Sequence, residues 1–181
     1  MVNLASRNPD FYPLEEFYAL RGDPAPVLWR TEPVNMPEPY HSLLVHRSDM
    51  TSTLEHFYKE QLHIDAIARR TVENEYYREV VLVLDRSGKC VEYGAIKIML
   101  DLFPIDARQE ILREQQPLGR ILNVFGVVFT SRPRAYLRMD SDKFINGALH
   151  LKKREILFGR RNTLLDEWDR PLAEIVEILP P

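Results

Sequence analysis

Arg78 is a charged residue in a mostly apolar run, residues 76–84, whose β-branched and aromatic composition is typical of a strand. Its guanidinium is a planar fork of donors that pairs bidentately with a carboxylate, and burying that charge without an anion is costly. A ligand carboxylate is one candidate partner. The alternatives are an arginine that points to solvent, or one that pairs with Glu79 or Glu92.

Two glutamates near the C-terminus, Glu174 and Glu177, are the candidates for a carboxyl that moves a proton. Both lie in a predicted strand over residues 171–179, where side chains alternate between the two faces. If Glu177 is buried there, its pKa should be raised, which suits proton transfer. Periodicity does not decide which glutamate points inward, because each shares its face with apolar residues: Ala173, Ile175 and Leu179 for one, Leu172 and Val176 for the other.

Two predicted helix starts offer further candidates for a binding site. Leu118 follows Pro117, which suits the first turn of a helix, and free backbone N–H groups at such a start favour an anion. Met50 lies in a polar segment, residues 48–55, where Ser52 and Glu55 have capping-box spacing. Each of Met50 and Leu118 is either a pocket wall or an ordinary core residue.

Other chemistry is disfavoured by spacing. The five histidines lack a zinc-binding pattern, and no glycine-rich phosphate loop is present, so we expect no metal and no cofactor. Cys90 is the only cysteine and is expected to be a small buried residue. The formal net charge of -3 argues against a nucleic-acid partner, despite basic clusters at residues 132–138 and 152–161, where Arg160 and Arg161 are candidates for attracting an anion.

The elements that must position these residues indicate one α+β domain with an antiparallel sheet. The chain has 181 residues, enough for a single core. Patterns predict helices near residues 48–58, 106–114 and 117–122. They predict strands over 76–84, 90–98, 134–139, 155–165 and 171–179, the first two forming a hairpin.

The first 40 residues hold seven of the thirteen prolines and are expected to form an irregular arm around a domain of residues 41–181. No targeting signal is visible, and the apolar run 80–84 is far too short to enter a membrane. With a single cysteine, the cytoplasm is the expected compartment.

Five segments share an order and spacing that cover about residues 40–180. They are Ser48-Asp49-Met50-Thr51, Tyr77-Arg78-Glu79-Val80-Val81-Leu82, Gln116-Pro117-Leu118-Gly119-Arg120, Gly159-Arg160-Arg161-Asn162, and Pro171-Leu172 with Glu177-Ile178-Leu179-Pro180. Together they resemble the successive landmarks of the chorismate pyruvate-lyase family. That resemblance implies helices packed on one sheet around a ligand pocket. It also implies a cofactor-independent carbon–oxygen lyase that converts chorismate to 4-hydroxybenzoate and pyruvate.

Carried over residue by residue, the ligand contacts of the family fall on Met50, Arg78, the backbone of Leu118, and Glu177, while Gly94 matches a glycine of the pocket. Arg78 and Glu177 are then the expected catalytic residues, and the expected partner is a small dianion like chorismate. This chain has one residue more between Pro171 and Glu177 than the best-known bacterial lyases, so a slip would bring Glu174 to the site. The Glu-Ile-Leu-Pro ending favours Glu177.

Two other functions compete with the lyase. Related folds serve as effector domains of transcription regulators, so the chain is alternatively a non-catalytic module that binds a small aromatic acid. The absence of a DNA-binding helix pair before the domain argues against that role. A hot-dog thioesterase is disfavoured, because no acid or histidine begins a long central helix. The oligomeric state is left open by the sequence.

Overall fold

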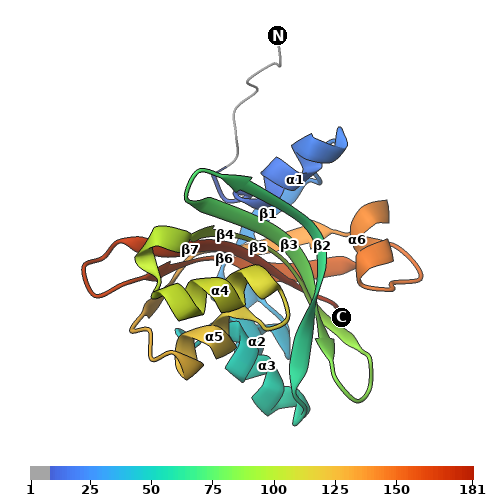
Figure 1. Cartoon of the computed structure of the whole chain (residues 1–181). Helices are drawn as coiled ribbons and strands as arrows, with labels where there is room; N and C mark the ends of the chain where they lie inside the picture. Colours follow the sequence, from blue (N-terminus) through green and yellow to red (C-terminus); the bar gives the residue numbers. More distant parts are fainter. Residues whose placement is uncertain (1–8) are drawn as a thin grey trace.

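One antiparallel sheet forms the centre of the protein, whose residues 9–181 are described by a computed structural model. Its strands follow the order β1-β5-β6-β7-β4-β3-β2 (Figure 1). The α+β class and the single antiparallel sheet predicted from the sequence are confirmed. The strands are β1 (Leu28–Thr31), β2 (Leu62–Val72), β3 (Glu75–Leu84), β4 (Cys90–Met99), β5 (Thr130–Asp140), β6 (Ile156–Leu165) and β7 (Pro171–Leu179).

Helices cover both faces of this sheet, as Figure 1 shows. One face packs against α2 (Tyr40–Leu44), α3 (Met50–Tyr58), α4 (Ile105–Arg113) and α5 (Leu118–Val124). The other face packs against α1 (Leu14–Arg21) and α6 (Lys143–Ala148). Two short 3-10 helices, η1 (Pro33–Asn35) and η2 (Leu100–Leu102), complete the described elements. Because both faces are covered, β3 is buried along nearly its whole length, which explains its long apolar run.

The start of α3 differs from the predicted capping box. Asp49 is the N-cap, and its carboxylate accepts a hydrogen bond of 2.8 Å from the backbone N–H of Ser52. Glu55 instead pairs with Arg120 of α5 and accepts the N–H of Leu62. Asp49 therefore places Met50 at the first helical position, at the edge of the sheet-facing side.

The N-terminal segment is more regular than expected. Irregular chain is the wrong prediction for residues 14–21 and 28–31, which form α1 and the edge strand β1. Phe17 and Tyr18 of α1 are buried in the core on the face opposite α3, so the prolines flank the elements instead of preventing them. Residues 1–8 of the predicted arm lie outside the described part, and the division at residue 40 stays a prediction.

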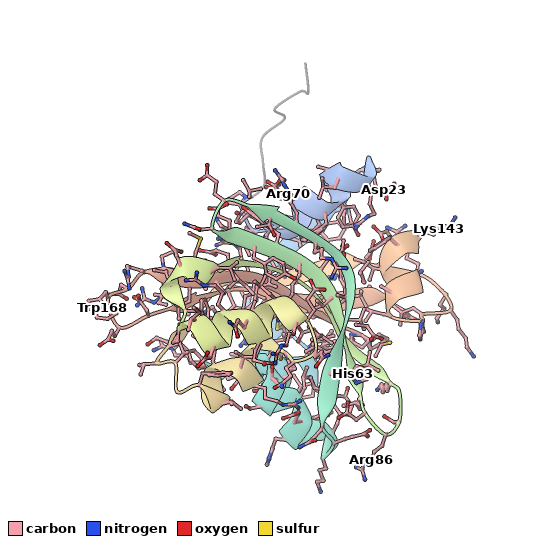
Figure 2. The ribbon with its side chains drawn as sticks, in the orientation of Figure 1. Asp23, His63, Arg70, Arg86, Lys143 and Trp168 are labelled. Atoms are coloured by element: carbon pink, nitrogen blue, oxygen red, sulfur yellow. The ribbon has the colours of Figure 1, made fainter. Side chains whose placement is uncertain are left out.

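No helix within residues 9–181 is long and apolar enough to cross a lipid bilayer. The longest helices, α3 and α4, have nine residues each. Exposed charged side chains such as Arg70, Arg86 and Lys143 lie at the periphery of the molecule (Figure 2).

Candidate functional site

A cavity lies between the sheet and the starts of α3 and α5. It offers about 60 Å³ for the centres of water-sized molecules. Its apolar wall comes from the five strands β2, β3, β4, β6 and β7: Ile64, Val80, Leu82, Ile96, Leu164 and Ile175. Such an enclosure, apolar with a few polar groups, is the usual form of a small-molecule site.

All five residues that the resemblance brought forward line this cavity. They are Met50, Arg78, Gly94, Leu118 and Glu177. They come from α3, β3, β4, α5 and β7, so residues as far apart in the chain as Met50 and Glu177 meet at one cavity. Met50 and Leu118 close the helical side and are buried, whereas Gly94 lies on the sheet side between Val80 and Glu177.

The strand register arranges the polar residues in two rows on the cavity face. Arg78, Ile96, Ile175 and Asn162 form one row across β3, β4, β7 and β6. The next row on that face contains Val80, Gly94, Glu177 and Arg160. Two residues along a strand separate the rows, which is about 7 Å. The cavity therefore has a cationic end at Arg78 and a carboxyl end at the second row.

Arg78 is almost completely buried, with 2% of its surface exposed. Its only hydrogen bond is a long one, 3.5 Å from Nη1 to the carbonyl oxygen of Ile111, and Nε has no partner within the described residues. Burial lowers the pKa of Arg78, and Tyr76 and Glu114 oppose that effect. Glu114 itself is engaged by Arg69 and by the hydroxyl of Tyr76. Arg78 makes no ion pair with any residue from 9 to 181.

The alternative partners considered for Arg78 are placed elsewhere. Glu79 lies on the opposite face of β3, where it pairs with Arg21 and accepts the hydroxyl of Tyr93. Glu92 lines the same cavity but forms no ion pair with Arg78 in the described structure. Arg78 does not point to solvent either.

Glu177 is buried on the cavity face, but it is not an isolated acid. Its carboxylate pairs with Arg160, which is completely buried. Arg160 also donates to three backbone carbonyls of the segment before α3: Leu44 at 3.2 Å, His46 at 3.1 Å and Ser48 at 3.3 Å. The pair therefore ties this segment to the sheet. An arginine-bound carboxylate is poorly suited to the proton transfer expected of Glu177.

Glu174 lies on the other face of the sheet. It accepts hydrogen bonds from Arg161 at 2.8 Å and from the hydroxyl of Thr163 at 3.1 Å. A small surface hollow there is lined by Glu174, Lys97 and Tyr12. Of the two candidate glutamates, Glu177 is the one that lines the cavity.

Glu92 is a cavity residue that the sequence analysis considered only as a partner for Arg78. It is 5% exposed, and its Oε2 has no hydrogen-bond partner in the described part of the chain. Burial and the neighbouring charge of Glu177 raise the pKa of Glu92 well above its ordinary value, although Arg160 opposes this. Its two-residue spacing from Gly94 on one strand was the signal that could have identified it.

The segments set aside in the sequence behave as ordinary structure. No group of three or more potential metal ligands occurs within residues 9–181. The basic clusters are largely engaged: Arg132 pairs with Asp169, Arg154 pairs with Asp140, and Arg138 stacks on Trp29.

The sequence matches no family model, and no curated protein is significantly similar to it. Solved structures do share the fold. PhnF from Mycobacterium smegmatis is 14% identical with a TM-score of 0.58, over 75% of this chain and 65% of the PhnF chain. The effector domain of PhnF alone is 13% identical with a TM-score of 0.55, over 73% of this chain and 88% of the domain. A possible transcriptional regulator, YydK from Bacillus subtilis, is 9% identical with a TM-score of 0.50, over 66% of this chain and 57% of the YydK chain.

These neighbours contradict the expected lyase. The protein spans less than two thirds of the PhnF chain but most of the PhnF effector domain, and YydK is described as a possible transcriptional regulator. The prediction of a cofactor-independent carbon–oxygen lyase is therefore wrong. The geometry offers a physical reason, because the proposed catalytic carboxyl of Glu177 is held by Arg160.

Proposed function

We propose that this protein is a non-catalytic domain that binds a small aromatic monocarboxylate in the cavity between the sheet and α3 and α5. The binding residues are Arg78, Met50, Gly94, Leu118 and Glu177. The ligand carboxylate pairs with Arg78, the ring lies against the apolar wall, and the backbone of Leu118 contributes a contact at the start of α5.

The observation that carries this proposal is the state of Arg78. An arginine keeps its charge in proteins, and a buried charge without a partner is expensive. Arg78 is buried and has no carboxylate partner among the described residues. A carboxylate in the cavity supplies the missing anion and accepts two parallel hydrogen bonds from the guanidinium.

The size of the cavity favours a single ring. One water needs about 10–15 Å³ of such space, so the cavity corresponds to roughly four or five waters. A benzene ring with a substituent opposite its carboxylate fits the spacing of about 7 Å between the two polar rows. The apolar residues between the rows offer a surface for that ring.

The charges of the cavity favour one carboxylate over two. Arg78 is the unpaired cation, whereas Arg160 is already neutralised by Glu177. A second ligand carboxylate would lie near the carboxylate of Glu177 and would be repelled. A monoanion therefore suits the cavity better than the chorismate-like dianion expected from the sequence.

Membership of the chorismate lyase-like superfamily and a cytoplasmic location stay predictions. The superfamily prediction is supported by five family contacts that lie around one cavity. Binding to an effector domain of this fold does not require turnover, which agrees with the engaged state of Glu177.

Calorimetric titration with 4-hydroxybenzoate tests the proposal. We expect binding by the wild-type protein and a loss of roughly 2–4 kcal/mol in Arg78→Lys, because a point charge replaces a bidentate fork. Arg161→Lys is the matched control, since Arg161 lies on the opposite face of the sheet with Glu174. Equal affinity in wild type and Arg78→Lys would refute the role of Arg78, and no binding of any benzoate would refute the ligand class.

A further inference from the structure

Three acids line the cavity: Asp49 caps α3, Glu177 pairs with Arg160, and Glu92 has neither kind of partner in the described structure. Its side chain is buried, and its Oε2 has no hydrogen-bond partner in the described structure. A methyl group added at Gly94 would lie 3.1 Å from Glu92 Oε1, so the carboxyl leans back over Gly94. Gly94 belongs to the row of Glu177, about 7 Å along the strand from the row of Arg78.

The surroundings of Glu92 favour the neutral form of its carboxyl. Glu177 holds the negative charge of this end of the cavity because Arg160 pairs with it. Burial and, after it, the neighbouring charge of Glu177 raise the pKa of Glu92 well above its ordinary value. A neutral carboxyl has one donor and one acceptor to offer, whereas the carboxylate of Glu177 can only accept.

An unpaired buried carboxyl needs a polar partner. On the cavity face Leu82 lies directly across from Glu92 on β3, and the charged neighbours Glu177 and Arg160 are engaged with each other. A ligand whose carboxylate lies on Arg78 reaches this point with the ring substituent opposite the carboxylate. A buried group left unsatisfied by such a ligand loses affinity.

We propose that Glu92 is a specificity-determining residue, whose carboxyl exchanges hydrogen bonds with a hydroxyl on the ligand ring opposite the carboxylate bound by Arg78. This inference rests on the proposed function and adds the second functional group of the ligand. It assigns recognition of the hydroxyl to Glu92, a residue that is not among the binding residues named above. The domain then selects hydroxy-substituted aromatic acids over equally large acids whose substituent is apolar.

The test compares 4-hydroxybenzoate with 4-methylbenzoate, which has similar size but no hydroxyl, by calorimetry on the full chain. Wild type is expected to prefer the hydroxy acid at least tenfold. Glu92→Leu should abolish or reverse this preference, because an apolar side chain then faces the substituent. Glu92→Gln should keep it, because an amide also donates and accepts. Glu174→Leu, on the opposite face, is the control that should leave it unchanged.

The outcomes separate this inference from the proposed function. If both benzoates bind wild type equally well, or if Glu92→Leu keeps the full preference for 4-hydroxybenzoate, Glu92 does not read the substituent and the inference is overturned, while the benzoate site stands. If neither benzoate binds wild type, the proposed function fails and the inference fails with it. A preference lost in Glu92→Leu and kept in Glu92→Gln supports both.

Discussion

Arg78 and Arg160 are both buried on the same face of one sheet, and their surroundings differ completely. Arg160 pairs with Glu177 and donates to three backbone carbonyls of the segment before α3. Arg78 has a single long hydrogen bond to Ile111 and no ion pair within residues 9–181. Strand positions and burial alone would have assigned the two residues the same role.

The difference separates a structural charge from a binding charge. Arg160 has its anion inside the protein, so its interactions are complete before any ligand arrives. Arg78 lines the cavity and lacks an anion, so its interactions can be completed by a ligand. Mutating the first should therefore act on folding, and mutating the second should act on binding.

The largest expected effect is that of Arg160→Met on stability. The substitution leaves the buried carboxylate of Glu177 unpaired beside Glu92 and removes the guanidinium donor from the carbonyls of His46 and Ser48. Loss of one partner of a buried pair costs about 3–5 kcal/mol. Urea unfolding measures the change in the free energy of unfolding.

Arg161→Met is the matched control for Arg160→Met. Arg161 is the next residue of β6, on the opposite face, and its side chain keeps 18% exposure while it pairs with Glu174. A partly exposed pair contributes about 1 kcal/mol or less. Equal destabilisation by the two substitutions would show that the buried pair has no special weight.

Glu92→Gln should change how stability depends on pH. The carboxyls and bases around the cavity are Glu177, Asp49, Arg78, Arg160 and, behind Arg160, His46. The ordinary pKa of a glutamate is 4.5, and that of Glu92 in the folded protein is raised well above it. Above 4.5 the folded state therefore keeps a proton on Glu92 that the unfolded state loses, so the contribution of Glu92 to wild-type stability falls as pH rises.

The glutamine variant lacks this titration. Its free energy of unfolding relative to wild type should rise with pH above about 4.5, until the folded-state pKa of Glu92 is passed. Thermal or urea unfolding across that range measures the difference. A difference that stays constant with pH would mean that Glu92 ionises in the folded protein as it does in the unfolded chain.

Gly94→Ala has the smallest expected effect on stability and acts on the cavity. The added methyl would lie 3.1 Å from the flexible end of Glu92 and 3.5 Å from the carbonyl oxygen of Val176, so folding should tolerate it. The methyl narrows the space between the two rows, and affinity for 4-hydroxybenzoate should fall about tenfold. Gly147→Ala on α6, where nothing lies within 4 Å, should bind as wild type does. An unchanged affinity in Gly94→Ala would place the ring elsewhere.

The sequence predicted the central elements well and the peripheral ones poorly. The predicted strand over residues 171–179 matches β7, and the hairpin of β3 and β4 was anticipated from its apolar runs. β2 was not predicted, because it is an edge strand whose outer two thirds are largely exposed and mix apolar with polar residues without a regular alternation. The short helix α6 also escaped, because its six residues carry too little periodicity.

Part of the site was readable for a similar reason. A charge inside an apolar strand marked Arg78, since burial follows from its neighbours along the chain. The pairing of Glu177 with Arg160 depends on the register of β6 against β7, which no local pattern encodes. Placing Glu92 at the cavity required knowing which face of β4 packs against α3 and α5, which depends on the tertiary structure.

The central claim is that the anionic partner of buried Arg78 is the ligand. The most direct test measures the free energy of unfolding of wild type and Arg78→Met, with and without saturating 4-hydroxybenzoate. Without ligand, the variant should be more stable by about 2 kcal/mol, because an uncompensated buried charge is replaced by an apolar chain of similar length. With ligand, wild type should gain stability and the variant should not. A variant that is less stable without ligand, or that gains as much from 4-hydroxybenzoate as wild type does, would contradict the account.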